Sequence, residues 1–262
     1  MSELIKHECG IAMIRLLKPL DFYQDKYGDP LYGLNKLQLL LQKMRNRGQD
    51  GAGLATIKLD PEPGTRYISR YRTNSKNYIS DLFQHVFRHF VDLDPALLKE
   101  PGWLKANKPY TGELLMGHLR YGTHGSNTIE TCHPFLRQNN WISRNLVLAG
   151  NFNLTNVDEM FDELVELGQF PKEKSDTVTV LEKIGHFLDD EVQRLFTWFK
   201  PDGYNNEEIT KKIIDHLDIQ RLLRRASKKW DGGYVLGGFV GHGDAFMMRD
   251  PNGIRPAYYY HD

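Results

Sequence analysis

The sequence has little of what would mark a secreted or membrane-spanning protein. It has two cysteines in 262 residues, too few for a disulfide framework, a four-cysteine zinc site or an all-cysteine iron–sulfur cluster within this chain. Every long apolar stretch is interrupted by charge, so no membrane span is expected. Residues 1–8 lack an apolar central region and do not form a secretory signal. A cytoplasmic location is the simplest expectation.

An excess of one charge is also lacking. Lys and Arg together number 34, as do Asp and Glu, so nothing in the composition points to nucleic acid or to an acidic membrane surface as a partner. Hydrophobic residues make up 40% and charged residues 26% of the sequence, which is ordinary for a globular protein. A chain of this length forms one large domain or two small ones.

Short apolar strands and amphipathic helices follow one another without regular alternation. Strands are predicted at residues 10–17, 54–59, 67–71, 114–118, 146–149, 233–240, 245–249 and 257–260. Helices are predicted at residues 34–44 and 79–90, after Asn156, after Ser175, and as one helix over 209–222. Residues 92–110 and 200–208 are polar and are predicted to be loops. The adjacent strand pairs favour an α+β fold with antiparallel sheets. A final strand so close to the last residue suggests that the natural protein continues.

Cys9 stands at the start of the first predicted strand. A single free cysteine is commonly a small buried hydrophobic residue. As a nucleophile it would need a base, and no Cys–His–Asn arrangement is evident nearby. An α-amino group, whose pKa is about 8, could take the thiol proton if Cys9 were the first residue. That chemistry requires removal of residues 1–8, which are predicted to be a leader.

Residues 46–53 read Asn-Arg-Gly-Gln-Asp-Gly-Ala-Gly and follow a predicted helix. A helix end that leads into a strand explains the three glycines as a tight turn. It does not explain why Arg47, Gln49 and Asp50 stand together.

Residues 117–125 read Gly-His-Leu-Arg-Tyr-Gly-Thr-His-Gly and carry Arg120 from a strand into a glycine-rich loop. Arg is suited to forked binding of a carboxylate, and Thr123 can add a hydroxyl donor. The histidines in and after this segment have no carboxylate at regular ligand spacing, so no metal site is predicted.

Two further segments carry candidate polar groups. The side chain of Asn151 and the backbone N–H of Phe152 offer two donors for an oxyanion, although Asn is also a common turn residue. Ser175 and Asp176 mark the start of a helix. Asp176 either caps that helix or holds the ammonium group of a ligand.

Taken in this order, these segments resemble the class II glutamine amidotransferases, which are N-terminal-nucleophile hydrolases. The matching residues are 9–11, 47–50, 117–121, 151–156 and 175–176. The Arg-Gly-Gln-Asp segment and the octamer Arg-Asp-Pro-Asn-Gly-Ile-Arg-Pro at 249–256 narrow the resemblance to the amidophosphoribosyltransferase family. Each segment alone is weak, whereas their order, together with the octamer, is specific.

The resemblance implies that residues 9–262 form a glutaminase domain with an α+β fold, a four-layer αββα sandwich containing two antiparallel sheets. Cys9 would attack the side-chain amide of glutamine, with its own α-amine as the base. Arg47 and Gly48 would help to position the terminus. Ammonia would leave, and water would release glutamate from the thioester.

The same resemblance implies the binding residues. Arg120 and Thr123 would hold the carboxylate of glutamine, and Asp176 its ammonium group. Asn151 and the N–H of Phe152 would form the oxyanion hole. Phe152 stands where the family commonly has glycine, and because a positive φ would strain Phe, a locally altered loop is expected there.

In this family the ammonia passes to phosphoribosyl pyrophosphate in a C-terminal phosphoribosyltransferase domain. The product is phosphoribosylamine, in the first committed step of de novo purine synthesis. That domain is absent from this sequence. The expected partners are glutamine and the missing domain, with a homo-oligomer left open. No cofactor is expected in this chain, since Mg²⁺ would accompany phosphoribosyl pyrophosphate in the absent domain.

Three alternatives stay open at this point. The chain could be a glutamine-binding or regulatory module without catalysis, which the uncleaved leader and Phe152 would favour. It could be another class II amidotransferase with a different acceptor. It could also be a hydrolase of the same fold acting on other amides, although Arg120 and Asp176 together favour an amino-acid substrate.

Overall fold

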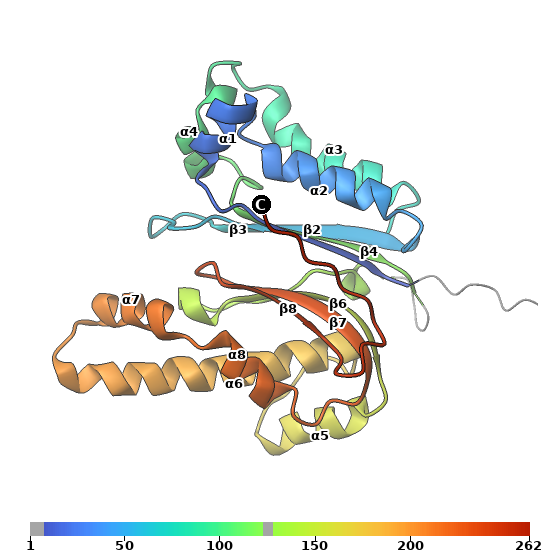
Figure 1. Ribbon diagram of the computed structural model, residues 1–262, viewed down its shortest axis with the longest axis vertical. Coiled ribbons are helices and arrows are strands. Elements are labelled where there is room, and N and C mark those ends of the chain that lie inside the picture. The colour runs from blue at the N-terminus through green and yellow to red at the C-terminus, as the bar shows by residue number, and fades with distance from the viewer. Residues whose placement is uncertain (1–7, 123–127) are drawn as a thin grey trace, which may run out of the picture. The chain divides into compact units, whose positions relative to one another are not determined.

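The computed structural model describes residues 8–122 and 128–262, which fall in two compact units that divide after Pro134 (Figure 1). We call these the N-terminal unit and the C-terminal unit. Each contains one four-stranded sheet with helices packed against it. The predicted pair of antiparallel sheets is therefore present, with one sheet in each unit.

The sheet of the N-terminal unit has the order β1-β4-β2-β3, and all neighbours are antiparallel. Its strands are β1 (Gly10–Arg15), β2 (Gly51–Ile57), β3 (Ile68–Thr73) and β4 (Leu114–Arg120). The central strand β4 pairs on one side with β1, so that Gly10 faces Leu119. It pairs on the other side with β2, so that Gly51 faces Arg120. The starts of β1 and β2 thus meet the end of β4.

Four α-helices accompany this sheet: α1 (Leu20–Tyr27), α2 (Tyr32–Lys43), α3 (Tyr78–Val91) and α4 (Pro101–Asn107). Helix α2 packs on β1 and β4, and α3 packs on β2 and β3. Leu37 and Leu41 of α2, Leu54 of β2 and Leu82 of α3 are fully buried in the core between them. The apolar spacing that predicted α2 and α3 therefore marks the faces that cover the sheet.

The sheet of the C-terminal unit has the order β5-β6-β7-β8 and is also antiparallel. Its strands are β5 (Phe135–Arg137), β6 (Leu146–Leu154), β7 (Gly232–Val240) and β8 (Ala245–Arg249). Strand β6 pairs with β7 along its whole length, whereas β5 pairs only with residues 146–148 of β6. The second half of β6 therefore extends beyond β5.

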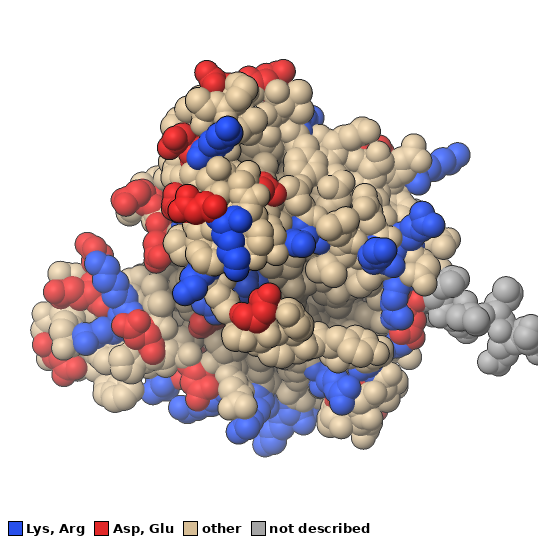
Figure 2. Space-filling model, turned by 45° about the horizontal axis from the view of Figure 1, so that its top comes forward, with Lys and Arg blue, Asp and Glu red and all other residues tan. Residues whose placement is uncertain are grey.

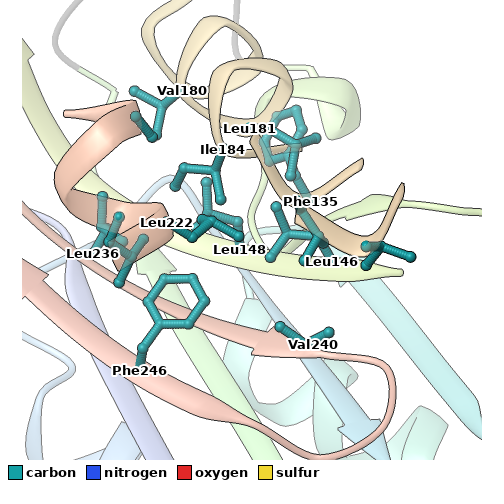
Figure 3. Packing of buried hydrophobic residues seen from close by; sticks show 14 of the residues in the cluster. Phe135, Leu146, Leu148, Val180, Leu181, Ile184, Leu222, Leu236, Val240 and Phe246 are labelled. Atoms are coloured by element: carbon teal, nitrogen blue, oxygen red, sulfur yellow. The ribbon is translucent and has the colours of Figure 1, made fainter. Parts of the chain in front are cut away.

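Four α-helices belong to this unit: α5 (Val157–Glu166), α6 (Asp176–Phe199), α7 (Asn206–His216) and α8 (Ile219–Ala226). The long helix α6 contacts α5, α7, α8 and the two strands β5 and β6. Figure 3 shows the core where these elements meet, with Leu148 of β6, Ile184 of α6 and Leu222 of α8 among its side chains. Short 3-10 turns complete the described elements: η1 (Leu97–Lys99), η2 (Ile129–Thr131), η3 (Ile142–Arg144) and η4 (Lys200–Asp202).

Several boundaries differ from the sequence prediction. Residues 92–110 are not only loop, because α4 begins at Pro101 and buries Leu104; proline is favourable in the first turn of a helix. The single helix predicted over 209–222 is two helices, because the Asp218 side chain accepts a hydrogen bond from the N–H of Arg221 and starts α8 afresh. Helix α1 carried too few apolar residues to be predicted.

The predicted strand at 257–260 is wrong. Tyr258, Tyr259 and Tyr260 are each at least 79% exposed and lie outside every described strand. Aromatic and β-branched residues favour strands only where a neighbouring strand and a packed face are available.

Charges of both signs are interspersed over the face shown in Figure 2. This distribution agrees with the equal numbers of acidic and basic residues. Among the described residues, no helix has the length and apolar character needed to cross a membrane.

The core of the C-terminal unit should be sensitive to truncation at Leu148, which is fully buried. We expect Leu148→Ala to lower the free energy of unfolding by about 2–5 kcal/mol, because it removes buried methyl groups and leaves a cavity. Leu167→Ala is the control, since Leu167 is 53% exposed and should change stability by no more than about 0.5 kcal/mol. Urea denaturation measures both variants. Equal stabilities for the two would contradict this description of the core.

Candidate active site

The Cys9 side chain lies against the backbone that follows β4. Its sulfur accepts a hydrogen bond from the Tyr121 N–H at 3.3 Å and lies 3.7 Å from the Tyr121 carbonyl oxygen. The pairing of β1 with β4 produces this contact, because Gly10 is aligned with Leu119. Two residues 112 positions apart in the sequence are thereby held together.

The thiol of Cys9 is not activated by its surroundings alone. Burial raises the pKa of Cys9, and the Tyr121 N–H and the charges of Arg120 and Arg47 offset only part of that effect. The thiolate is the reactive form of cysteine, so this site needs a base. In the sequence as given, the Cys9 nitrogen is joined to Glu8 in a peptide bond and cannot act as an amine.

The segment from Arg47 to Asp50 is fastened to the end of β4. A Cβ on Gly48 would lie 2.5 Å from the carbonyl carbon and oxygen of Leu119, so only glycine allows the two backbones to approach this closely. The Asp50 N–H donates to the Arg120 carbonyl at 2.9 Å, and the Asp50 carboxylate accepts from the Gly122 N–H at 2.7 Å. Asp50 therefore bonds to the residues on both sides of Tyr121, whose N–H contacts Cys9.

Arg47 lies next to the start of β1. Its guanidinium is 3.6 Å from the carboxylate of Glu8, and both side chains are at least one-third exposed, so the ion pair is weak. A Cβ on Gly10 would lie 3.3 Å from the Cβ of Arg47. The structure thus places Arg47 beside Cys9, while its predicted role in positioning a free terminus stays a prediction.

Arg120 is buried at the end of β4, with 6% of its surface exposed. The loop that follows folds back on it, since a Cβ on Gly122 would lie 2.8 Å from a guanidinium nitrogen. The structure thus brings Arg120 to the same strand end as Cys9. Thr123, its predicted companion, lies outside the described residues.

Two histidines of this unit, His118 and His133, are buried and stack on each other. The rings of His118 and His133 lie 4.2 Å apart, with 13° between their planes. Burial first, and then His118 and nearby arginines, lower the pKa of His133 well below its usual value. No group of three His, Cys, Asp or Glu side chains in the described part of the chain is placed to hold a metal ion.

In the C-terminal unit, Asn151 and Phe152 belong to strand β6, which continues to Leu154. The loop expected at this point is therefore a strand. Phe152 is not among the described non-glycine residues with positive φ, so the strain expected there does not arise. Its ring packs over Gly150, where a Cβ would lie 2.1 Å from the ring.

The hydrogen-bond pattern fixes the direction of the Phe152 N–H. Phe152 is opposite Tyr234 of β7. Tyr234 directs its N–H toward the Asp250 carboxylate at 3.4 Å and its carbonyl accepts from the Asp250 N–H at 2.8 Å. Opposed residues of an antiparallel pair exchange both backbone bonds or neither, so the Phe152 N–H points away from β7, toward the edge beyond β5.

Ser175 and Asp176 begin helix α6 as predicted. The Ser175 side chain accepts a hydrogen bond from the Val178 N–H at 3.4 Å and is the N-cap. Asp176 is the first residue of the helix, where a negative charge is favourable. Its predicted contact with a ligand ammonium group stays a prediction.

The predicted residues therefore fall in two groups. Cys9, Arg47, Gly48 and Arg120 meet in the N-terminal unit, whereas Asn151, Phe152 and Asp176 lie on the C-terminal unit. Asp50 and Tyr121 had no predicted role, because nothing in a sequence shows which loop a backbone N–H will reach.

Curated proteins similar to this chain include amidophosphoribosyltransferases. The enzyme of Pasteurella multocida is 27% identical over 219 residues, which cover 82% of this chain and 34% of that protein. The enzyme of Schizosaccharomyces pombe is 28% identical over 250 residues, which cover 95% of this chain and 36% of that protein. A glutamine–fructose-6-phosphate aminotransferase of Zymomonas mobilis is 28% identical, but over only 58% of this chain. No family model matches the chain.

Two solved structures show the fold. The glutamine phosphoribosylpyrophosphate amidotransferase of Bacillus subtilis has a TM-score of 0.52 and 21% identity, and the match covers 94% of this chain and 38% of that one. A second structure, described as the allosteric regulatory enzyme of purine biosynthesis, has a TM-score of 0.53 and 20% identity over 95% of this chain. The expected α+β N-terminal-nucleophile hydrolase fold is thus confirmed. The chain spans about one-third of the length of the curated amidophosphoribosyltransferases that it matches.

The raised pKa of Cys9 predicts how its thiol reacts while Glu8 is attached. The thiol of free cysteine has a pKa of about 8.5, and burial disfavours the thiolate of Cys9. The alkylation rate of Cys9 should therefore still rise with pH above the value at which the rate for free cysteine levels off. Peptide mass analysis after iodoacetamide treatment separates Cys9 from Cys132. Arg120→Gln should slow the alkylation of Cys9, because it removes a charge that lowers the pKa of the thiol. Arg15→Gln should not slow it, because Arg15 is an exposed residue at the other end of β1. A rate that levels off below pH 8 would contradict this prediction.

Proposed function

We propose that this chain is the glutamine-hydrolysing part of an amidophosphoribosyltransferase, and that it supplies ammonia for phosphoribosylamine formation in purine synthesis. One observation carries the proposal: Cys9 meets Arg47, Gly48 and Arg120 at one strand end. The similarity to amidophosphoribosyltransferases, over 82–97% of the chain, supports it.

The reaction begins with hydrolysis of the Glu8–Cys9 peptide bond, which converts the Cys9 nitrogen into an α-amine with a pKa of about 8. This amine takes the thiol proton, and the thiolate attacks the side-chain carbonyl carbon of glutamine. The oxyanion that forms accepts hydrogen bonds from the Asn151 side chain and the Phe152 N–H. The amine then gives its proton to the leaving nitrogen, ammonia departs, and water hydrolyses the thioester to glutamate and free Cys9.

Substrate selection follows from charge. In this proposal the Arg120 guanidinium holds the α-carboxylate of glutamine through two parallel N–H bonds, and Thr123 is assigned as a second donor to the same carboxylate. Asp176, at the start of α6, holds the α-ammonium group. An amide that lacks either charged group would leave one of these side chains without a partner and would bind weakly.

A second protein region uses the ammonia. We place the acceptor, phosphoribosyl pyrophosphate with Mg²⁺, in a phosphoribosyltransferase domain that corresponds to the part of the relatives outside the matched third. The cytoplasm is the proposed location, because both cysteines are free and a reducing compartment keeps them so.

A glutamine-binding module without catalysis is the second candidate function. It is favoured by the peptide bond at the Cys9 nitrogen and by the raised pKa of the Cys9 thiol. Such a module would use Arg120 and Asp176 to bind glutamine without converting it to glutamate.

Intact mass measured together with glutaminase activity distinguishes these functions. Protein that begins at Cys9 should release glutamate from glutamine, whereas the form that retains residues 1–8 and the Cys9→Ala variant should not. Cys132→Ala is the matched cysteine control and should remain active. A chain that begins at Cys9 and binds glutamine but never releases glutamate would contradict the glutaminase function and favour the binding module.

The predicted carboxylate contact can be tested with Arg120→Lys. We expect the KM for glutamine to rise about 10- to 100-fold, because a charge-assisted hydrogen bond contributes about 1.5–3 kcal/mol and lysine cannot form the forked pair. Arg70→Lys is the control, since Arg70 lies on β3 of the same sheet and donates to the Pro134 carbonyl. An unchanged KM in Arg120→Lys would remove Arg120 from the substrate site.

A further inference from the structure

Helices α2 and α3 lie side by side over the sheet of the N-terminal unit (Figure 1). The groove between them has a volume of about 690 Å³, which is within the range of sites that hold another molecule. One wall belongs to α2 and the residues that follow it, and the other wall belongs to α3. We name it the α2–α3 groove. The described residues of the candidate active site do not line it.

An apolar row on α3 forms the floor of the α2–α3 groove. The row consists of Ile79, Phe83, Phe87 and Val91. Residues four apart are neighbours on the surface of a helix, so the row runs along α3. Phe83 is buried in the core, whereas Ile79 and Phe87 are partly buried at its edge and Val91 is 75% exposed. The row therefore continues beyond the part of α3 that the core covers.

An arginine stands toward each end of the groove. Arg88 lies near the end of α3, and Arg45 follows the end of α2. Burial and the charge of Asp50 raise the pKa of Tyr78, and the charge of Arg45 opposes them, so Arg45 lies near the start of α3. Tyr78 and Arg88 are ten residues apart on α3, which corresponds to about 15 Å along the helix axis.

The lining of the groove contains no carboxylate to balance these two arginines. Its other polar side chains are neutral: Gln38, Gln42, Ser80 and Gln84. Asp81, in the first turn of α3, is not among the lining residues. Neither Arg45 nor Arg88 forms an ion pair with a described residue. The groove therefore suits an occupant that has an apolar surface and carboxylates at two points.

A second copy of this chain that presents the same groove does not fit this description. In a two-fold contact both copies present the same patch, so Arg45 and Arg88 of one copy would face the arginines of the other. Like charges placed opposite each other across an interface are costly. The occupant must therefore present a different, acidic surface.

We propose that the α2–α3 groove binds an acidic amphipathic helix of a partner protein. A helix in a groove places apolar residues at positions i, i+3 or i+4, and i+7 against the floor. Two glutamates eleven residues apart lie on one side of such a helix, about three turns or about 16 Å apart, which matches the span from Tyr78 to Arg88. This contact is separate from the glutaminase reaction and does not rest on the proposed function.

The probe is a dye-labelled helical peptide of about 16 residues, with an apolar row of leucines and two glutamates eleven residues apart. Its matched control has lysines in place of the two glutamates. A third peptide carries a central proline, which breaks a helix. Fluorescence anisotropy measures the Kd of each peptide for the full chain. The glutamate peptide should bind at least tenfold more tightly than either of the other two.

Charge reversal tests the two arginines. Arg45→Glu combined with Arg88→Glu should raise the Kd of the glutamate peptide at least tenfold, because attraction becomes repulsion at both ends. The same variant should bind the lysine peptide more tightly than the unsubstituted chain does, which also shows that it is folded. Lys36→Glu combined with Lys43→Glu changes the total charge equally. Both lysines are exposed on α2 and neither lines the groove, so this control should change the Kd less than about threefold.

Two further measurements place the peptide on the floor of the groove. Val91→Ser should weaken the binding of the glutamate peptide to the unsubstituted chain and of the lysine peptide to the charge-reversed chain, because it removes apolar surface that both contact. Amide hydrogen exchange of residues 79–91 should slow when the glutamate peptide is bound.

Equal binding of the glutamate and lysine peptides, or equal effects of the arginine and lysine reversals, would overturn the proposal. Absence of measurable binding by the glutamate peptide would overturn it as well. A chain that sediments as a dimer, and that the glutamate peptide does not dissociate while Val91→Ser does, would show that a second copy covers the groove and would also contradict the proposal.

Discussion

The pairing of β1 with β4 is the contact on which the rest of the candidate site depends. It fixes Cys9 at the end of β4, where the Tyr121 N–H reaches the sulfur and Arg120 emerges from the sheet. Gly48 and Asp50 matter because they hold β4 at the same point. A slip of one residue between β1 and β4 would turn every side chain of β1 to the opposite face and would separate the thiol from this loop.

The site combines two requirements that oppose each other. Burial excludes water and strengthens electrostatic interactions with a substrate, but it also raises the pKa of the Cys9 thiol. The proposed mechanism would resolve the conflict with an amine on the same residue, which delivers a base without adding another buried side chain. In the proposed mechanism, residues 1–8 would act as a chemical block, because the Cys9 nitrogen is an amide while Glu8 is attached to it. In the C-terminal unit, β6 extends beyond β5, so the predicted donor Phe152 lies in a strand and not in a loop.

Much of this arrangement could be predicted from the sequence, and the exceptions have physical causes. The apolar spacing of α2, α3 and α6 located the helices that cover the sheets, and the segments around Cys9, Gly48 and Arg120 do meet. Helix α4 was missed because its proline suggested a loop, and the tyrosines at 258–260 suggested a strand because propensity cannot show that a pairing partner is missing. Asp50 acts through the backbone N–H of Gly122, 72 residues later in the chain, and no periodicity reveals such a contact. The change from loop to strand at Phe152 likewise depends on β7, which lies about 80 residues later in the chain.

Covalent labelling tests the central claim, that Cys9 is the nucleophile of a glutamine site, most directly. A glutamine analogue with a chloromethyl ketone in place of its side-chain amide would be added to the chain that begins at Cys9, and the modified peptides would be identified by mass. The thiolate should displace chloride at Cys9 alone, and excess glutamine should protect it, because the analogue must first be held by its carboxylate and ammonium groups. Labelling of Cys132 to the same extent, or labelling of Cys9 that glutamine does not slow, would contradict the account.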